Sequence, residues 1–170
     1  MGKWAEEKKS GTFELLLTLP ASDAQIVLGK FLSALFFLML ILVFTLPLPI
    51  TMTFLGKLDC GQVLGSYFGI LFLGASYLAL GLFISSLTQN QIVAFLITVL
   101  VLFLSYILAA PIVTNTLPHV LVSVFQFMSF STHFESMARG VIDSRDVIYF
   151  LSTTGLFLYG NLLILGMRRV

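Results

Sequence analysis

Charged residues are scarce in this chain of 170 residues. Only 10% of the residues are Asp, Glu, Lys or Arg, whereas 58% are hydrophobic, and the formal net charge is +1 at pH 7. So little charge, so evenly balanced, creates no field that would attract nucleic acid from a distance. This much apolar surface cannot be buried inside a soluble domain of this size, so we expect lipid to surround the protein.

Residues for metal, thiol or nucleotide chemistry are also few. Cys60 is the only cysteine, which excludes an internal disulfide, and the two histidines, His119 and His133, are far from it in sequence. We therefore expect no metal and no cofactor. Gly29-Lys30 lacks the flanking residues of a phosphate-binding loop, and no hydrolase motif is present, so we expect no enzyme. Lys30 is expected instead to reach the lipid headgroups with its ammonium.

Long apolar runs dominate what is present. An α-helix needs about 20 apolar residues to cross the hydrocarbon core of a bilayer. Ser22 with Gln25, and Thr88 with Gln91, fit the capping box that starts a helix. The sequence predicts an all-α integral membrane bundle. Its transmembrane helices are expected at about 26–46, 63–87, 92–112 and 147–167.

These four spans carry no Asp, Glu, Arg or His near their middles. A pump that drives itself with protons or ions needs such groups inside the membrane, so an external energy source is expected. The polar residues within or beside the spans are expected to form hydrogen bonds between helices. They are Tyr77, Ser85, Ser86, Tyr106 and Asn161.

Positive charges predict the orientation. Lysines precede the first span and arginines follow the last, whereas the loop between the first two spans has only Lys57 beside Asp59. Because cytoplasmic segments are enriched in Lys and Arg, we expect both termini to be cytoplasmic, in the inner (plasma) membrane. The positive residues that support this are Lys3, Lys8, Lys9, Lys30, Arg168 and Arg169.

The region between the third and fourth spans is unusual. Its apolar stretch 120–130 is too short to cross a bilayer, so 117–140 should be re-entrant or lie along the interface on the external side. Thr132 and Glu135 form a further capping-box pattern that would open a short helix, and Gly140 would close it. The charged elbow expected here comprises His133, Glu135, Arg139 and Asp143.

Gly61, Gly65 and Gly69 recur every four residues at the start of the second span. This spacing places three residues without side chains on one helical face, which lets another helix approach closely. We expect this helix to be central to the bundle or to lie at a subunit interface.

The segment from Trp4 to Leu19 mixes charge with apolar residues at helical spacing, such as Phe13 and Leu16. It is expected to form an amphipathic helix on the cytoplasmic surface. Composition alone would also allow a simple membrane-surface anchor.

The order of residues favours a role for this segment in docking onto a partner protein, because three blocks of the sequence resemble those of ABC-2 type permeases. The later two blocks look most like the gliding-motility-associated branch of that family. The blocks are Glu6-Glu7-Lys8-Lys9-Ser10-Gly11-Thr12-Phe13-Glu14-Leu15-Leu16-Leu17-Thr18-Leu19-Pro20, Gly81-Leu82-Phe83-Ile84-Ser85-Ser86-Leu87-Thr88-Gln89-Asn90-Gln91 and His133-Phe134-Glu135-Ser136-Met137-Ala138-Arg139-Gly140-Val141-Ile142-Asp143.

The resemblance implies a permease subunit that exports an unknown substrate with ATP hydrolysed by a separate ATPase subunit. Segment 4–19 would be the coupling helix that rests on the ATPase, and a second permease copy, identical or related, would complete the path. The residues that would contact the ATPase are Glu6, Glu7, Gly11, Thr12 and Glu14.

Members of that family usually have six spans, two of them ahead of the coupling helix. The chain is therefore expected to lack these two, to insert but not transport alone, and to leave its glycine face open to them. The alternative is a non-transporting scaffold that anchors an ATPase for assembly of a surface machine such as the gliding apparatus.

Overall fold

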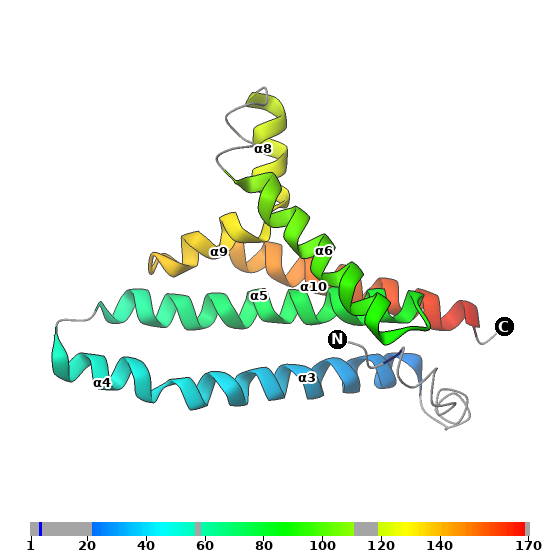
Figure 1. The fold of residues 1–170 in the computed structure, drawn as a ribbon, viewed down its shortest axis with the longest axis horizontal. Helices are drawn as coiled ribbons and strands as arrows, with labels where there is room; N and C mark the ends of the chain where they lie inside the picture. Colours follow the sequence, from blue (N-terminus) through cyan, green and yellow to red (C-terminus); the bar gives the residue numbers. More distant parts are fainter. Residues whose placement is uncertain (1–3, 5–21, 57–58, 111–118, 169–170) are drawn as a thin grey trace.

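The fold was examined in a computed structural model that describes residues 4, 22–56, 59–110 and 119–168 (Figure 1). Every element in these residues is an α-helix, which confirms the all-α prediction. The helices are α3 (Asp23–Thr45), α4 (Pro47–Leu55), α5 (Cys60–Leu87), α6 (Gln91–Ala109), α8 (His119–Met128), α9 (Phe130–Ala138) and α10 (Ser144–Arg168).

Helix α5 is the centre of the bundle, because α3, α6, α9 and α10 all pack against it. Figure 1 shows α3 antiparallel to α5 and α10 parallel to it, whereas α6 and α8 rise away from these helices. We call the end where α3 begins and α5 finishes the Trp4 end. The opposite end, where α5 begins and α9 finishes, is called the elbow end.

Two of the predicted helix starts can be compared directly. The capping box at Ser22 is confirmed, because Gln25 N donates to Ser22 Oγ at 3.3 Å and Ser22 N donates to Gln25 Oε1 at 3.1 Å. The predicted box at Thr88 is wrong. Thr88 ends α5, and the side chain of Asn90 caps α6 by accepting from Ile92 N at 3.0 Å. Asn is among the strongest capping residues and stands next to the first helical residue.

Three of the predicted spans correspond to helices long and apolar enough to cross a membrane. These are α3 continued by α4 (Asp23–Leu55), α5 (Cys60–Leu87) and most of α10 (Ser144–Met167). Helix α6 has 19 residues, hence a length of about 28 Å, close to the thickness of the hydrocarbon core. Its apolar part, Gln91–Ile107, is shorter, so a crossing by α6 stays a prediction.

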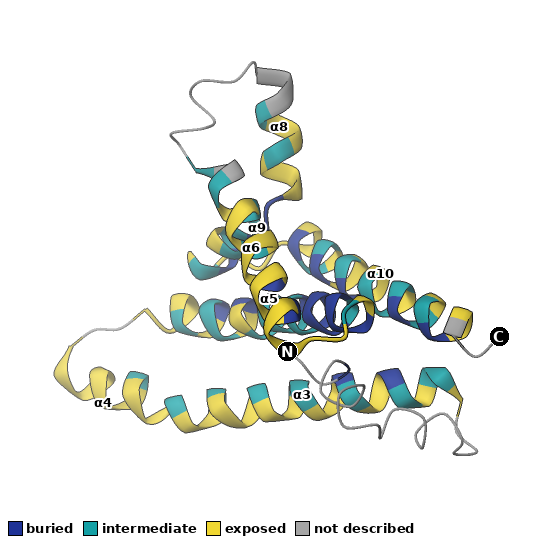
Figure 2. Cartoon of the chain, turned by 45° about the vertical axis from the view of Figure 1, so that its right-hand side comes forward, coloured by how far each residue is buried: buried dark blue, intermediate teal, exposed yellow. Residues whose placement is uncertain are grey.

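The outward faces of α3, α4 and α6 are apolar and exposed (Figure 2). On α3, for example, the side chains of Phe36, Phe37 and Phe44 are 68%, 64% and 75% exposed. Soluble proteins rarely present such continuous apolar surfaces to water. The bundle is therefore that of a membrane protein, as predicted.

Candidate functional site

The five residues expected to contact an ATPase, at positions 6, 7, 11, 12 and 14, lie outside the described residues. The residues on both sides of them are described. Ser22 caps α3 on one side, and Trp4 lies on the other.

Trp4 is fully buried in the bundle. Its backbone N–H donates to Ser85 Oγ at 3.2 Å, and its side chain packs in a cluster of buried apolar residues from α3, α5 and α10. Lys30 Nζ lies 3.5 Å from the centroid of a Trp4 ring, a distance at which the ring attracts a cation. The sequence suggested a surface position for Trp4 and a headgroup contact for Lys30, and it did not reveal that they meet.

At the elbow end, α9 begins earlier than predicted. Ser129 caps it, because its Oγ accepts from Ser131 N at 3.3 Å, and Thr132 lies inside the helix. The capping-box prediction at Thr132 is therefore wrong, since a hydroxyl nearer to the start of the helix supplies the cap. Gly140 does close the helix as predicted, with a φ of +85° that favours glycine.

His133 is the best-connected residue of the elbow. Its Nδ1 lies 2.7 Å from Asp146 Oδ1, and its Nε2 lies 3.0 Å from the carbonyl oxygen of Phe127. The carbonyl can only accept, so Nε2 carries a proton. The contact to Asp146 joins the ring to the first turn of α10. The pair is nearly buried, with side-chain exposures of 11% and 9%.

Aromatic rings surround this histidine. Tyr149 stacks on it with centroids 3.9 Å apart, and Phe127 and Phe150 approach edge-on at 5.9 and 6.3 Å. The Tyr149 hydroxyl donates to the carbonyl oxygen of Met128 at 2.6 Å. Together these contacts fix α10 to the end of α8 and the start of α9.

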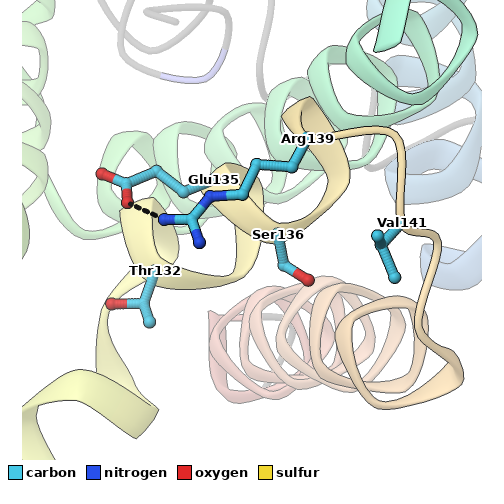
Figure 3. A pocket seen from close by; sticks show the side chains of 5 residues that line it. All are labelled: Thr132, Glu135, Ser136, Arg139 and Val141. Atoms are coloured by element: carbon cyan, nitrogen blue, oxygen red, sulfur yellow. Dashed lines mark ion pairs between the residues drawn. The ribbon is translucent and has the colours of Figure 1, made fainter. Parts of the chain in front are cut away.

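The remaining predicted elbow residues take other roles. Asp143 does not pair with His133; its Oδ1 accepts from Arg145 N at 3.0 Å beside the start of α10. Glu135 and Arg139 form a solvent-exposed ion pair at 3.6 Å. That pair borders an open hollow of about 320 Å³ on α9, drawn in Figure 3. Asp146 was missed because a single acidic residue in the first turn of a helix is common there.

The glycine face of α5 packs against α9. A Cβ on Gly65 would overlap the carbonyl oxygen of Met137 and lie 3.0 Å from Gly140 Cα, and one on Gly69 would come within 3.1 Å of the Phe134 ring. Gly61 is exposed, yet its backbone carbonyl carbon lies 3.0 Å from a Cβ built on Gly140. At Gly65 and Gly69 the glycine face is thus already covered by α9 and the turn at Gly140. The prediction that this face stays open to two additional transmembrane helices is therefore wrong.

The hydroxyl of Ser76 links α5 to α10. It lies 3.2 Å from the carbonyl oxygen of Phe150 and 3.1 Å from Thr154 Oγ1. Of the polar residues expected to link helices, Ser86 bonds to the carbonyl of Phe83 in its own helix. The amide of Asn161 is buried and finds no hydrogen-bond partner among the described residues.

No group of three His, Cys, Asp or Glu side chains that could hold a metal ion occurs in residues 22–56, 59–110 and 119–168. The polar groups described above join helices to one another, and none of them forms a nucleophile with an adjacent base. These groups therefore serve the packing of the helices.

Comparison with known proteins agrees with this description. The family described as ABC-2 family transporter protein matches residues 4–158, which is most of the chain. The match does not single out the gliding-motility branch. Neither a curated protein nor a solved structure matches the chain.

Proposed function

The chain belongs to the ABC-2 family of transporter proteins, and we propose that it is the permease subunit of an ATP-driven exporter. The family match over residues 4–158 is the observation that carries this proposal. Because the family forms the membrane component, we expect a separate ATPase subunit to hydrolyse the ATP.

We propose that the ATPase contacts the segment between Trp4 and Ser22, through Glu6, Glu7, Gly11, Thr12 and Glu14. Charged residues there would offer ion pairs, and the small residues would permit close approach. The geometry supports this, because Trp4 is buried in the bundle and Ser22 caps α3, so both ends of the segment meet the same end of the bundle.

The test is to co-express and purify the chain with candidate ABC ATPase subunits from the same genome. Glu14→Lys is expected to insert normally but to lose the ATPase or its ATP-dependent effect on the permease. Glu135→Lys is the matched control, because it reverses an exposed carboxylate at the elbow end. Equal ATPase recovery and equal response to ATP in wild type and Glu14→Lys would reject the contact.

We propose that both termini face the cytoplasm. Six lysines and arginines lie near the ends of the chain, against three in the two loops expected outside, and cytoplasmic segments are enriched in Lys and Arg. The six are Lys3, Lys8, Lys9, Lys30, Arg168 and Arg169, and the three are Lys57, Arg139 and Arg145. Cys60 is exposed at the elbow end, so a membrane-impermeant maleimide should label it on intact spheroplasts. A cysteine at Ser22, in a Cys60→Ser background, should react only after the membrane is opened. The reverse pattern would overturn the orientation.

We propose that a second permease copy completes the translocation path across the membrane. Helix α6 supports this, because among its residues 91–107 only Ala94 and Thr98 are buried within a single copy. Its other described faces therefore remain for lipid or a partner. Native mass measurement of the complex in nanodiscs should find two permease chains, and one chain for each active complex would contradict the proposal.

A further inference from the structure

Trp4 contacts three helices, α3, α5 and α10, at the Trp4 end of the bundle. Its backbone is bonded to Ser85 near the end of α5, and its ring lies under the ammonium of Lys30 in the second turn of α3. Val27 and Phe31 of α3, with Leu165 of α10, belong to the same buried cluster. A force applied to the backbone of Trp4 therefore acts on three helices at once.

The position of Trp4 in the chain places this contact beside the proposed ATPase-contacting segment. The proposed ATPase-contacting segment begins immediately after Trp4 and ends at Ser22, which caps α3. This segment is thus attached to the bundle twice, once directly through α3 and once through Trp4. Through α3, a movement can reach α5 only by way of the side chains packed between the two helices, whereas through Trp4 it acts directly on Ser85 of α5.

Helix α5 continues from this contact to the elbow end. Its 28 residues span about 42 Å, and at its first turns Gly65 lies against the backbone of Met137 and Gly140. Packing this close leaves little room for α5 to slide independently of α9. A displacement at Ser85 would therefore be transmitted to the elbow.

We propose that Trp4 is a positioning residue that transmits movement of the ATPase-contacting segment to α5. It does so through the bond from its backbone to Ser85 and through the packing of its ring with Ala79 and Leu82. Lys30 of α3 holds that ring in place. This inference rests on the proposed function above. It goes further by naming the attachment point and the helix that responds.

The attachment can be tested without an ATPase, because Trp4 is the only tryptophan and its fluorescence reports on this site alone. In nanodiscs, acrylamide should quench wild-type Trp4 weakly. Lys30→Met should raise the exposed fraction roughly fivefold, the factor that a cation–π contact is typically worth. Lys30→Arg keeps a cation over the ring and should behave as wild type.

Arg145→Met serves as the charge control, because it removes a cation at the elbow end. It should leave the quenching unchanged. Wild-type quenching as strong as in the unfolded chain would overturn the attachment. So would equal quenching in wild type and Lys30→Met.

Transmission can be measured at Cys60, the only cysteine, which lies at the far end of α5 from Ser85. In the purified complex with its ATPase, Mg-ATP should change the rate at which a maleimide labels Cys60. Trp4→Leu and Lys30→Met should abolish most of this change while retaining the ATPase and the rate measured without nucleotide. A purely structural role would lower the yield of folded complex and leave the ATP response of the remainder intact.

The outcomes separate the two proposals. An ATP response in wild type that persists unchanged in Trp4→Leu and Lys30→Met would overturn the role of Trp4 and leave the proposed function standing. No ATP response in wild type would count against the ATP-driven function and therefore against the inference as well. Loss of the response in both variants, with Arg145→Met normal, is the expected result.

Discussion

Substituting Gly65 by Ala should weaken the junction between α5 and α9. The added methyl group would overlap the carbonyl oxygen of Met137 and lie 3.0 Å from Gly140 Cα. Both are backbone atoms, so no side chain can rotate to make room. Forcing an extra methyl group into a close-packed site typically costs about 1–3 kcal/mol.

Part of this cost is offset, because replacing glycine by alanine within a helix stabilises it by roughly 0.5–1 kcal/mol. The clash is with backbone, so the upper half of that cost applies, about 2–3 kcal/mol, and we expect Gly65→Ala to lower the free energy of unfolding by about 1–2.5 kcal/mol overall. Gly69→Ala should cost less, because no atom lies closer than 3.1 Å and the nearest belongs to the ring of Phe134, which can rotate. Gly155→Ala meets nothing within 4 Å and should be neutral or slightly stabilising.

The assay is reversible unfolding by sodium dodecyl sulfate in mixed micelles, followed by helical circular dichroism. The three variants should rank Gly65→Ala, Gly69→Ala and Gly155→Ala from least to most stable. Labelling of Cys60 should also accelerate in Gly65→Ala, because the first turns of α5 would separate from α9. Equal midpoints for Gly65→Ala and Gly155→Ala would refute the close approach of the two backbones.

Three further substitutions probe the elbow and the α5–α10 contact. His133→Ala should cost about 3–5 kcal/mol by leaving the buried carboxylate of Asp146 unpaired, and adding Asp146→Ala should recover most of that loss in a double-mutant cycle. Ser76→Ala should cost about 1 kcal/mol, whereas Ser152→Ala, whose exposed hydroxyl bonds only within α10, should change unfolding by less than about 0.5 kcal/mol. Arg139→Ala should cost at most about 1 kcal/mol, because its ion pair is exposed to solvent. A large loss in Arg139→Ala, or none in His133→Ala, would contradict this assignment of roles.

The helices themselves were predictable because apolar length is decisive in a membrane. A stretch of about 20 apolar residues has few stable alternatives to a helix once lipid is the solvent. Helix starts were less predictable. The capping-box pattern needs only two residues, so it also occurs by chance, and at Thr88 and Thr132 the nearby Asn90 and Ser129 supply the cap instead.

The partners of the elbow residues depended on the rotation of α10, which the sequence does not specify. Asp143 and Asp146 are both near the start of that helix, and either could have met His133. In the structure Asp143 accepts from a backbone N–H of the first turn, whereas Asp146 faces the histidine. The packing of α10 on α5, to which Ser76 contributes, and the contacts of Tyr149 with α8 and α9 fix which carboxylate points inward.

Small residues carried the most reliable information about which face of α5 is buried. In lipid, every face of a helix can be apolar, so hydrophobicity alone cannot identify the face that meets protein. Gly65 and Gly69 did identify it, because only residues without bulky side chains allow another backbone to come this close. They could not identify the partner, since any helix or turn can use the same space. The partner is the end of α9, where Gly140 lets the chain turn away with a positive φ, so the approach requires glycine on both sides.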